Sequence, residues 1–163
     1  MASQKMLTEL NNQIQEEIFS SYLYLSMAAC FADKNLNGCA QWMTIQSQEE
    51  YAHAMKFYQY VLDIGGRVEL QAIQKPDFEW PTPLSMFEGA LAHEKHVTGR
   101  INLLVDIAVE EKDHATNNFL TFFVGEQVEE EANATQIVEN FKMVGDNIQG
   151  LYMLDKELGA RQV

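Results

Sequence analysis

The turns between four long helical stretches limit the fold of this chain more than any other feature. Helical stretches cover residues 5–33, 38–64, 83–111 and 115–144, and a short fifth covers 147–159. Turns of a few residues near 35 and 113 make the helices of each consecutive pair antiparallel. The two pairs are separated by 18 residues, 65–82, that lack helical periodicity.

The length of this separating segment decides how the second pair is placed. A helix of about 27 residues is about 40 Å long, whereas about 18 extended residues span about 60 Å. The segment can therefore return along the whole bundle and start a helix parallel to the second. The sequence predicts an all-α fold, a four-helix bundle with one long crossover connection and a short fifth C-terminal helix.

Residues at the ends of these stretches support the boundaries. Gly65 and Gly66 are typical of a helix C-terminus. Thr82 followed by Pro83 is typical of an N-terminus, with Ser85 as an alternative capping residue.

Composition limits the class of protein. The 163 residues, of which 47% are hydrophobic, suit one globular domain covering 1–163. A net charge of −13 argues against a nucleic-acid partner. The longest near-apolar run, 22–32, is about half a membrane span, and residues 1–10 lack the apolar core of a signal peptide. We therefore expect no membrane partner, a cytoplasmic location, and free thiols at Cys30 and Cys39.

Charged and polar residues interrupt the apolar face of the second helix. Following that face from Trp42 gives Gln46, Glu50, His53 and Phe57. An ionised carboxylate removed from water without a partner is very costly. This face therefore needs a partner for its polar groups.

The other helices carry matching residues. The spacing of Glu17, Glu50 and His53 is repeated 77 positions later by Glu94, Gln127 and Glu130. In both antiparallel pairs these residues fall at the same mid-bundle height, so four carboxylates, one imidazole and one amide converge. Each residue alone is compatible with a solvated or locally paired position, but the repeated spacing favours a common centre. Carboxylates with a single imidazole suit two ions of a metal such as iron or manganese.

Three further glutamates adjoin the centre. Glu49, Glu126 and Glu129 are rotated towards its edge, where like charges at one height repel. A solvated face and a third cation site are both consistent with this pattern.

The sequence resembles the ferritin family over essentially its whole length. The resemblance rests on the stretches 17–28, 48–57, 93–98, 126–131 and 151–158, read as "EIFSSYLYLSMA", "QEEYAHAMKF", "HEKHVT", "EQVEEE" and "LYMLDKEL". It implies a ferritin-like bundle, iron storage and assembly into a homo-oligomeric hollow shell of 24 subunits. It also implies ferroxidase activity, in which Fe²⁺ is oxidised by O₂ or hydrogen peroxide and deposited as ferric oxyhydroxide.

The same resemblance implies roles for individual residues. Glu17, Glu50 and His53 would bind the first iron, and Glu50, Glu94 and Glu130 the second, with Glu50 bridging. Gln127 would be the nearby amide and Tyr24 the tyrosine beside the centre. Glu49, Glu126 and Glu129, with Glu130, match a third iron site of the bacterial and archaeal non-haem type.

The sequence departs from two related types of ferritin at positions that bind haem or line a pore. Bacterioferritins repeat Glu-x-x-His on the fourth helix and place a haem-binding methionine after the bridging glutamate, where this chain has Glu130 and Tyr51. No haem is therefore expected. Asn117 and Leu120 replace the acidic pair of the animal-type threefold pore, which leaves the route of iron uptake open. We expect His93 and His96 to face solvent or a neighbouring subunit.

Two other functions remain open on sequence grounds. A di-iron enzyme acting on an organic substrate needs a pocket beside the metals. A non-catalytic shell subunit is expected to lack some of the ligands, but Glu17, His53 and Glu94 are all present.

Overall fold

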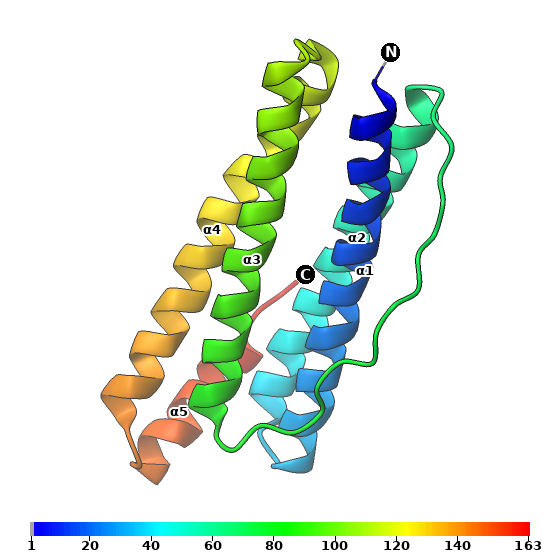
Figure 1. Cartoon of the computed structure of the whole chain (residues 1–163). Helices are drawn as coiled ribbons and strands as arrows, with labels where there is room; N and C mark the ends of the chain where they lie inside the picture. Colours follow the sequence, from blue (N-terminus) through cyan, green and yellow to red (C-terminus); the bar gives the residue numbers. More distant parts are fainter. Residues whose placement is uncertain (1) are drawn as a thin grey trace.

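The computed structural model describes residues 2–163 and forms a bundle of long helices (Figure 1). The described helices are α1 (Gln4–Asp33), α2 (Asn37–Asp63), α3 (Pro83–Glu110), α4 (His114–Val144) and α5 (Ile148–Gly159). Each helix begins and ends within one residue of the bounds expected from the sequence. The predicted fold class is confirmed.

The connections follow the predicted topology. Helices α1 and α2 form one antiparallel hairpin, and α3 and α4 form the other. The segment 64–82 between α2 and α3 contains no helix and runs along the outside of the first hairpin, from one end of the bundle to the other (Figure 1). Helix α5 packs against α2 and α4 at the end of the bundle where α3 begins.

Local sequence explains where α3 begins and how the turn between α1 and α2 is formed. The Thr82 hydroxyl accepts a hydrogen bond from the Ser85 amide at 3.0 Å, and the Ser85 hydroxyl lies 3.0 Å from the Thr82 amide nitrogen. Thr82 is therefore the capping residue, and the alternative start at Ser85 is wrong, because Ser85 is the third helical residue of the same capping box. Asn35 adopts φ 60° in the first turn, a conformation that asparagine tolerates better than most residues.

Two apolar clusters fill opposite ends of the bundle. One includes Phe31, Phe87 and Phe141, with ring centroids 5.4 and 5.2 Å apart across the three helices. The other includes Phe57 and Phe123, which stack at 4.2 Å. On α1 the two clusters are contributed by residues 23–31 and 6–14, so residues 15–22 lie between them. A band of buried polar side chains occupies this middle level.

Two smaller expectations concern thiols and membranes. Cys39 is buried and Cys30 is half-buried, and both are free thiols, as expected. Among residues 2–163, no helix combines the length and the apolar character that a membrane crossing requires.

Candidate metal centre

The polar band at mid-bundle is built by all four long helices. The six of its buried members that the repeated spacing predicts expose at most 8% of their surface. They are Glu17 on α1, Glu50 and His53 on α2, Glu94 on α3, and Gln127 and Glu130 on α4. The structure therefore brings together every residue that the repeated spacing placed at one height.

Five of these residues form two overlapping groups with the geometry of metal sites. In the first group, Glu17, Glu50 and His53 each offer one ligand atom, all within 4.8 Å of one another. In the second, Glu50, Glu94 and Glu130 do the same. Glu50 belongs to both groups, so two cations bound there would share its carboxylate.

Two buried oxygen atoms at the first group lack a hydrogen-bond partner. The Gln13 side-chain amide donates to Glu17 Oε1 at 2.8 Å, but Glu17 Oε2 and Gln13 Oε1 have no hydrogen-bond partner. A buried carboxylate oxygen without a partner costs free energy unless a cation or proton satisfies it. The residues present therefore fit a bound cation.

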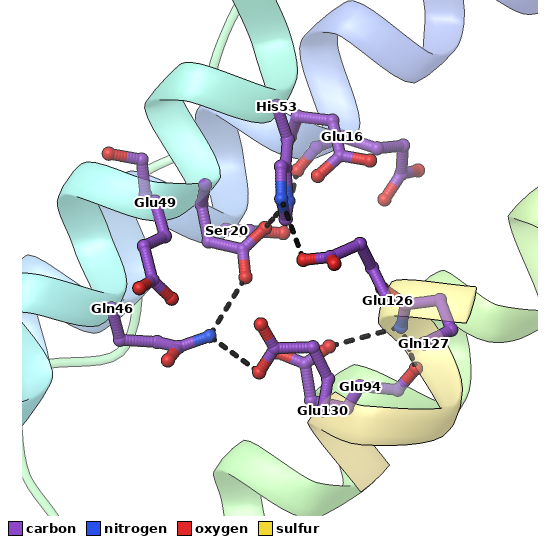
Figure 2. Close-up of polar contacts among 12 residues, drawn as sticks. Glu16, Ser20, Gln46, Glu49, His53, Glu94, Glu126, Gln127 and Glu130 are labelled. Atoms are coloured by element: carbon purple, nitrogen blue, oxygen red, sulfur yellow. Dashed lines mark hydrogen bonds and ion pairs between the residues drawn. The ribbon is translucent and has the colours of Figure 1, made fainter. Parts of the chain in front are cut away.

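The second group is held by donors from two helices. The Tyr24 hydroxyl donates a short hydrogen bond to Glu94 Oε1. The Gln127 amide donates to Glu94 Oε2 at 3.1 Å and also contacts the Glu94 carbonyl oxygen at 3.2 Å. Both expected residues thus contact the centre, and both orient the same carboxylate; Figure 2 shows the contact of Gln127 with Glu94.

Burial and mutual repulsion raise the pKa values of the carboxyl groups. Burial is the largest cause at Glu17 and Glu50, and the neighbouring carboxylates raise both pKa values further. The pKa of Glu94 is raised by burial in spite of its donors, and burial with the Glu94 charge raises the pKa of Glu130 to about 7. Without a cation, the centre therefore retains protons near neutral pH that metal binding would displace.

Tyr24 remains a hydrogen-bond donor in this environment. Burial is the main cause that raises the pKa of its phenol well above the usual value, and the Glu94 charge adds to it. The phenol therefore keeps its proton and points it at Glu94.

Gln46 is a member of the centre whose role the sequence did not reveal. Its amide nitrogen donates to Glu50 Oε1 at 3.0 Å and to Glu130 Oε2 at 2.9 Å, which links α2 to α4 (Figure 2). The side chain is 1% exposed. Its position four residues before Glu50 on the same helix face was the available signal.

The three edge glutamates have separate surroundings. Glu126 Oε2 lies 3.6 Å from His53 Nε2 (Figure 2), and Glu49 Oε2 accepts from Arg161 Nη2 at 2.7 Å. Glu129 is exposed. These glutamates do not form a compact group like the two described above.

The expectation for His93 holds only in part, because the side chain is half-buried against α1. Its Nε2 atom lies 2.7 Å from the Ser20 hydroxyl, and its ring packs edge-on against Phe19 and Tyr24 within the subunit. Loss of solvent is the main cause that lowers the pKa of His93 to about 4. His96 is exposed, as expected, with Nε2 2.9 Å from Glu16 Oε2.

Comparisons with known proteins agree with this geometry. The family model described as the ferritin-like domain matches residues 7–144. A bacterial non-heme ferritin of Bacteroides fragilis is 45% identical over 161 residues, which cover 99% of this chain and 100% of that protein. A bacterial non-heme ferritin of Staphylococcus aureus is 37% identical, with coverage of 99% and 97%.

Solved structures extend the likeness to three dimensions. An open pore ferritin from the hyperthermophilic archaeon Archaeoglobus fulgidus superposes with a TM-score of 0.99 at 51% identity, covering 99% of this chain and 100% of that one. A protein described as a humanized archaeal ferritin superposes at 0.98 with 52% identity, covering 99% and 98%.

The fold and the centre together define a helical-bundle protein with a carboxylate-rich interior site for cations. The match to the family model and the full-length relatives are more specific than this class. The chain belongs to the ferritin family, and its relatives named above are ferritins of bacteria and archaea.

Proposed function

We propose that this protein is a ferroxidase and iron-storage subunit. It oxidises Fe²⁺ at an intrasubunit centre for two irons and passes Fe³⁺ to a mineral of ferric oxyhydroxide inside a hollow shell. The observation that carries the proposal is the pair of overlapping ligand groups that share Glu50. Membership of the ferritin family supports it.

Charge balance supports occupancy by two divalent ions. The five ligands comprise four carboxylates and one imidazole, all buried. Two Fe²⁺ ions bring four positive charges and displace the protons that the raised pKa values retain. Glu17, Glu50 and His53 bind the first Fe²⁺, and Glu50, Glu94 and Glu130 bind the second.

The oxidation of two Fe²⁺ ions balances with either O₂ or hydrogen peroxide as the oxidant. Each of two Fe²⁺ ions loses one electron, and O₂ takes up both electrons with two protons to give hydrogen peroxide. If hydrogen peroxide is the oxidant, the same two electrons and two protons give two water molecules. Each Fe³⁺ then reacts with two waters to form ferric oxyhydroxide and releases three protons. Hard oxygen ligands favour the ferric state, so the protein must also let Fe³⁺ leave.

Gln127 is suited to that release. Its amide donates to Glu94 and adds no charge where the first hairpin has Glu50. The second position therefore holds Fe³⁺ less tightly. Tyr24 orients Glu94 and lies close enough to donate an electron or a hydrogen bond during oxidation.

A third, weaker iron position formed by Glu49, Glu126 and Glu129 is part of the proposal. Glu126 contacts His53, so at least one of the three glutamates lies next to the first ligand group. Changing all three residues to Gln leaves binding of the first two irons nearly intact and alters the ratio of iron oxidised per O₂. If wild type binds only two irons per subunit and the triple variant mineralises identically, these glutamates are a solvated face.

Assembly into a closed homo-oligomer, which we expect to contain 24 subunits, is supported by the exposed apolar residues of α5. Ile148, Tyr152 and Met153 expose 82, 62 and 69% of their surface. Apolar side chains gathered in this way mark a protein interface more often than free surface. A monomer in light scattering would count strongly against a storage function.

The direct test is aerobic addition of Fe²⁺ to purified protein, with the assembly weighed before and after. We expect rapid oxidation and a gain in mass from retained iron. Glu139→Gln on the exposed face of α4 removes one carboxylate away from the centre and serves as the control. Oxidation no faster than in buffer, with no retained iron, contradicts the proposal.

A further inference from the structure

The C-terminal segment reaches the metal centre from outside the bundle. Arg161 follows α5 and lies against α2, where its guanidinium carbon is 4.5 Å from the centre of the Trp42 ring. Its Nη1 atom donates to the Trp42 carbonyl oxygen at 3.3 Å, and Nη2 donates to Glu49 Oε2 at 2.7 Å. Stacking, a carbonyl and an ion pair therefore fix the guanidinium in place.

The same guanidinium contacts Gln46, the residue that links α2 to α4 at the centre. Arg161 Nη1 donates to Gln46 Oε1 at 2.9 Å. On the other side of the amide, Gln46 Nε2 donates to Glu50 and Glu130 (Figure 2). A continuous chain of hydrogen bonds thus runs from the C-terminal segment to two metal-binding carboxylates.

The chemistry of these groups permits one orientation of the amide. Arginine has donors and no acceptor, so Gln46 must present its carbonyl oxygen to Arg161 and its two N–H groups to the carboxylates. Without Arg161 the Gln46 carbonyl oxygen loses its partner, and only the two carboxylates hold the amide in this orientation. Half a turn would place its carbonyl oxygen against the carboxylate oxygens of Glu50 and Glu130, where acceptors repel each other.

We propose that Arg161 is a positioning residue for the metal centre, which fixes the Gln46 amide so that Glu50 and Glu130 are held in place for the second metal ion. This inference rests on the proposed function and deepens it. It predicts an effect on the second position, formed by Glu50, Glu94 and Glu130. The first position should be affected less, because Gln46 contacts only one of its three ligands, the shared Glu50.

The test uses Co²⁺ alone, whose visible absorption reports its coordination and which binds without the oxidation that Fe²⁺ undergoes. The assembled Arg161→Gln protein is titrated beside wild type and beside Lys142→Gln, which removes an equal charge from an exposed ion pair on α4. Loss of a partner that orients a ligand lowers metal affinity by about 10–100-fold. Because Arg161 acts through Gln46, which contacts two ligands of the second position and one of the first, we expect about a three- to tenfold loss at the second Co²⁺ and a smaller loss at the first.

A double-mutant cycle shows whether Arg161 acts through Gln46. Gln46→Leu weakens the second Co²⁺ as well, and adding Arg161→Gln to it should change nothing further. Circular dichroism and light scattering check that fold and assembly are kept. Arg161→Lys, which retains a donor for Gln46, should recover part of the lost affinity.

The outcomes are distinguishable. The proposal is overturned if Arg161→Gln titrates like wild type, or if its effect is as large in the Gln46→Leu background. If wild type binds fewer than two Co²⁺ ions per subunit near the centre, the proposed function itself fails. Two Co²⁺ ions in wild type with an unchanged variant overturn only the role of Arg161.

Discussion

The two helical hairpins have the same layout but contribute differently to the centre. Shifted by 77 positions, Glu17 corresponds to Glu94, Glu50 to Gln127 and His53 to Glu130. The α1–α2 hairpin supplies a complete group of three ligands, whereas the α3–α4 hairpin supplies two and shares Glu50. The repeat sets a common height, and the substitutions within it make the two ligand groups unequal.

The surroundings of the ligands differ in the same way. Gln46 of the first hairpin donates to two carboxylates, and its counterpart in the second is Phe123, whose ring centroid lies 5.7 Å from that of His53. At this height of the bundle, the first hairpin therefore contributes hydrogen bonds to the ligands, whereas the second contributes apolar packing. Variants of equivalent positions should give unequal effects.

The largest effect is expected at the one ligand that both groups share. Glu50→Ala removes a carboxylate from each position, so both irons lose a ligand. We expect the initial rate of Fe²⁺ oxidation to fall by about 100-fold or more, since loss of an outer partner alone costs about 10–100-fold. Stopped-flow absorbance after mixing with Fe²⁺ and O₂ measures this rate, and a loss no larger than that of Glu139→Gln would show that Glu50 is not shared.

His53→Ala and Glu130→Ala separate the two positions. The residues occupy equivalent places in the two hairpins but belong to different groups. Each variant should lose the tight binding of one metal, keep the other, and slow the fast phase of oxidation by about 10–100-fold. Anaerobic calorimetric titration counts the metals, and wild-type oxidation rates in both variants would refute the assignment of two irons.

Gln127→Glu makes the second hairpin more like the first. A carboxylate in place of the amide adds a charged ligand near the second position, so iron should bind there about tenfold more tightly, or about 1.4 kcal/mol. Fe³⁺ should leave more slowly, so that a second addition of Fe²⁺ oxidises more slowly than the first. Equal rates for successive additions would mean that Gln127 does not govern release.

The smallest effect concerns stability of the metal-free protein. The pKa of Glu130 is raised to about 7, so the native state holds this proton over a range of pH in which the unfolded state has lost it. Stability contributed by this group is therefore present below about pH 4.5, falls as the pH rises, and is lost above about pH 7. The total is on the order of 3 kcal/mol, because each pKa unit corresponds to about 1.4 kcal/mol.

Replacement of Glu130 tests the direction of this pH dependence of stability. At pH 8 metal-free Glu130→Gln should unfold at a temperature a few degrees above wild type, and the difference should vanish near pH 4.5. Calorimetry at several pH values, after chelation of metal, measures it. A variant less stable than wild type at pH 8 would show that the hydrogen bond from Gln46 outweighs the burial of charge.

Much of the fold and the gathering of the buried polar residues was predictable from helical periodicity and spacing. Helical periodicity and the turns near 35 and 113 set the topology, and the repeated spacing placed Glu17 and Glu94 at one height. The role of Gln46 was not predictable, because an amide on a buried face reveals no partner until α4 is placed opposite it. Arg161 was missed because its contact depends on where the segment after α5 lies.

His93 shows the limit of periodicity. It is adjacent to Glu94 in sequence, and helical spacing alone does not fix the rotation of α3 closely enough to separate a solvent-facing position from one against α1. The contacts with Ser20 and Phe19 decide it. Only the packed neighbour provides that information.

We propose that two unequal metal positions share Glu50 within one subunit. Anomalous scattering from crystals soaked anaerobically in Fe²⁺ tests it most directly, with data collected on both sides of the iron absorption edge. We expect two strong peaks at mid-bundle, one between Glu17, Glu50 and His53 and the other between Glu50, Glu94 and Glu130. A single peak, or iron bound only at exposed carboxylates, would contradict it.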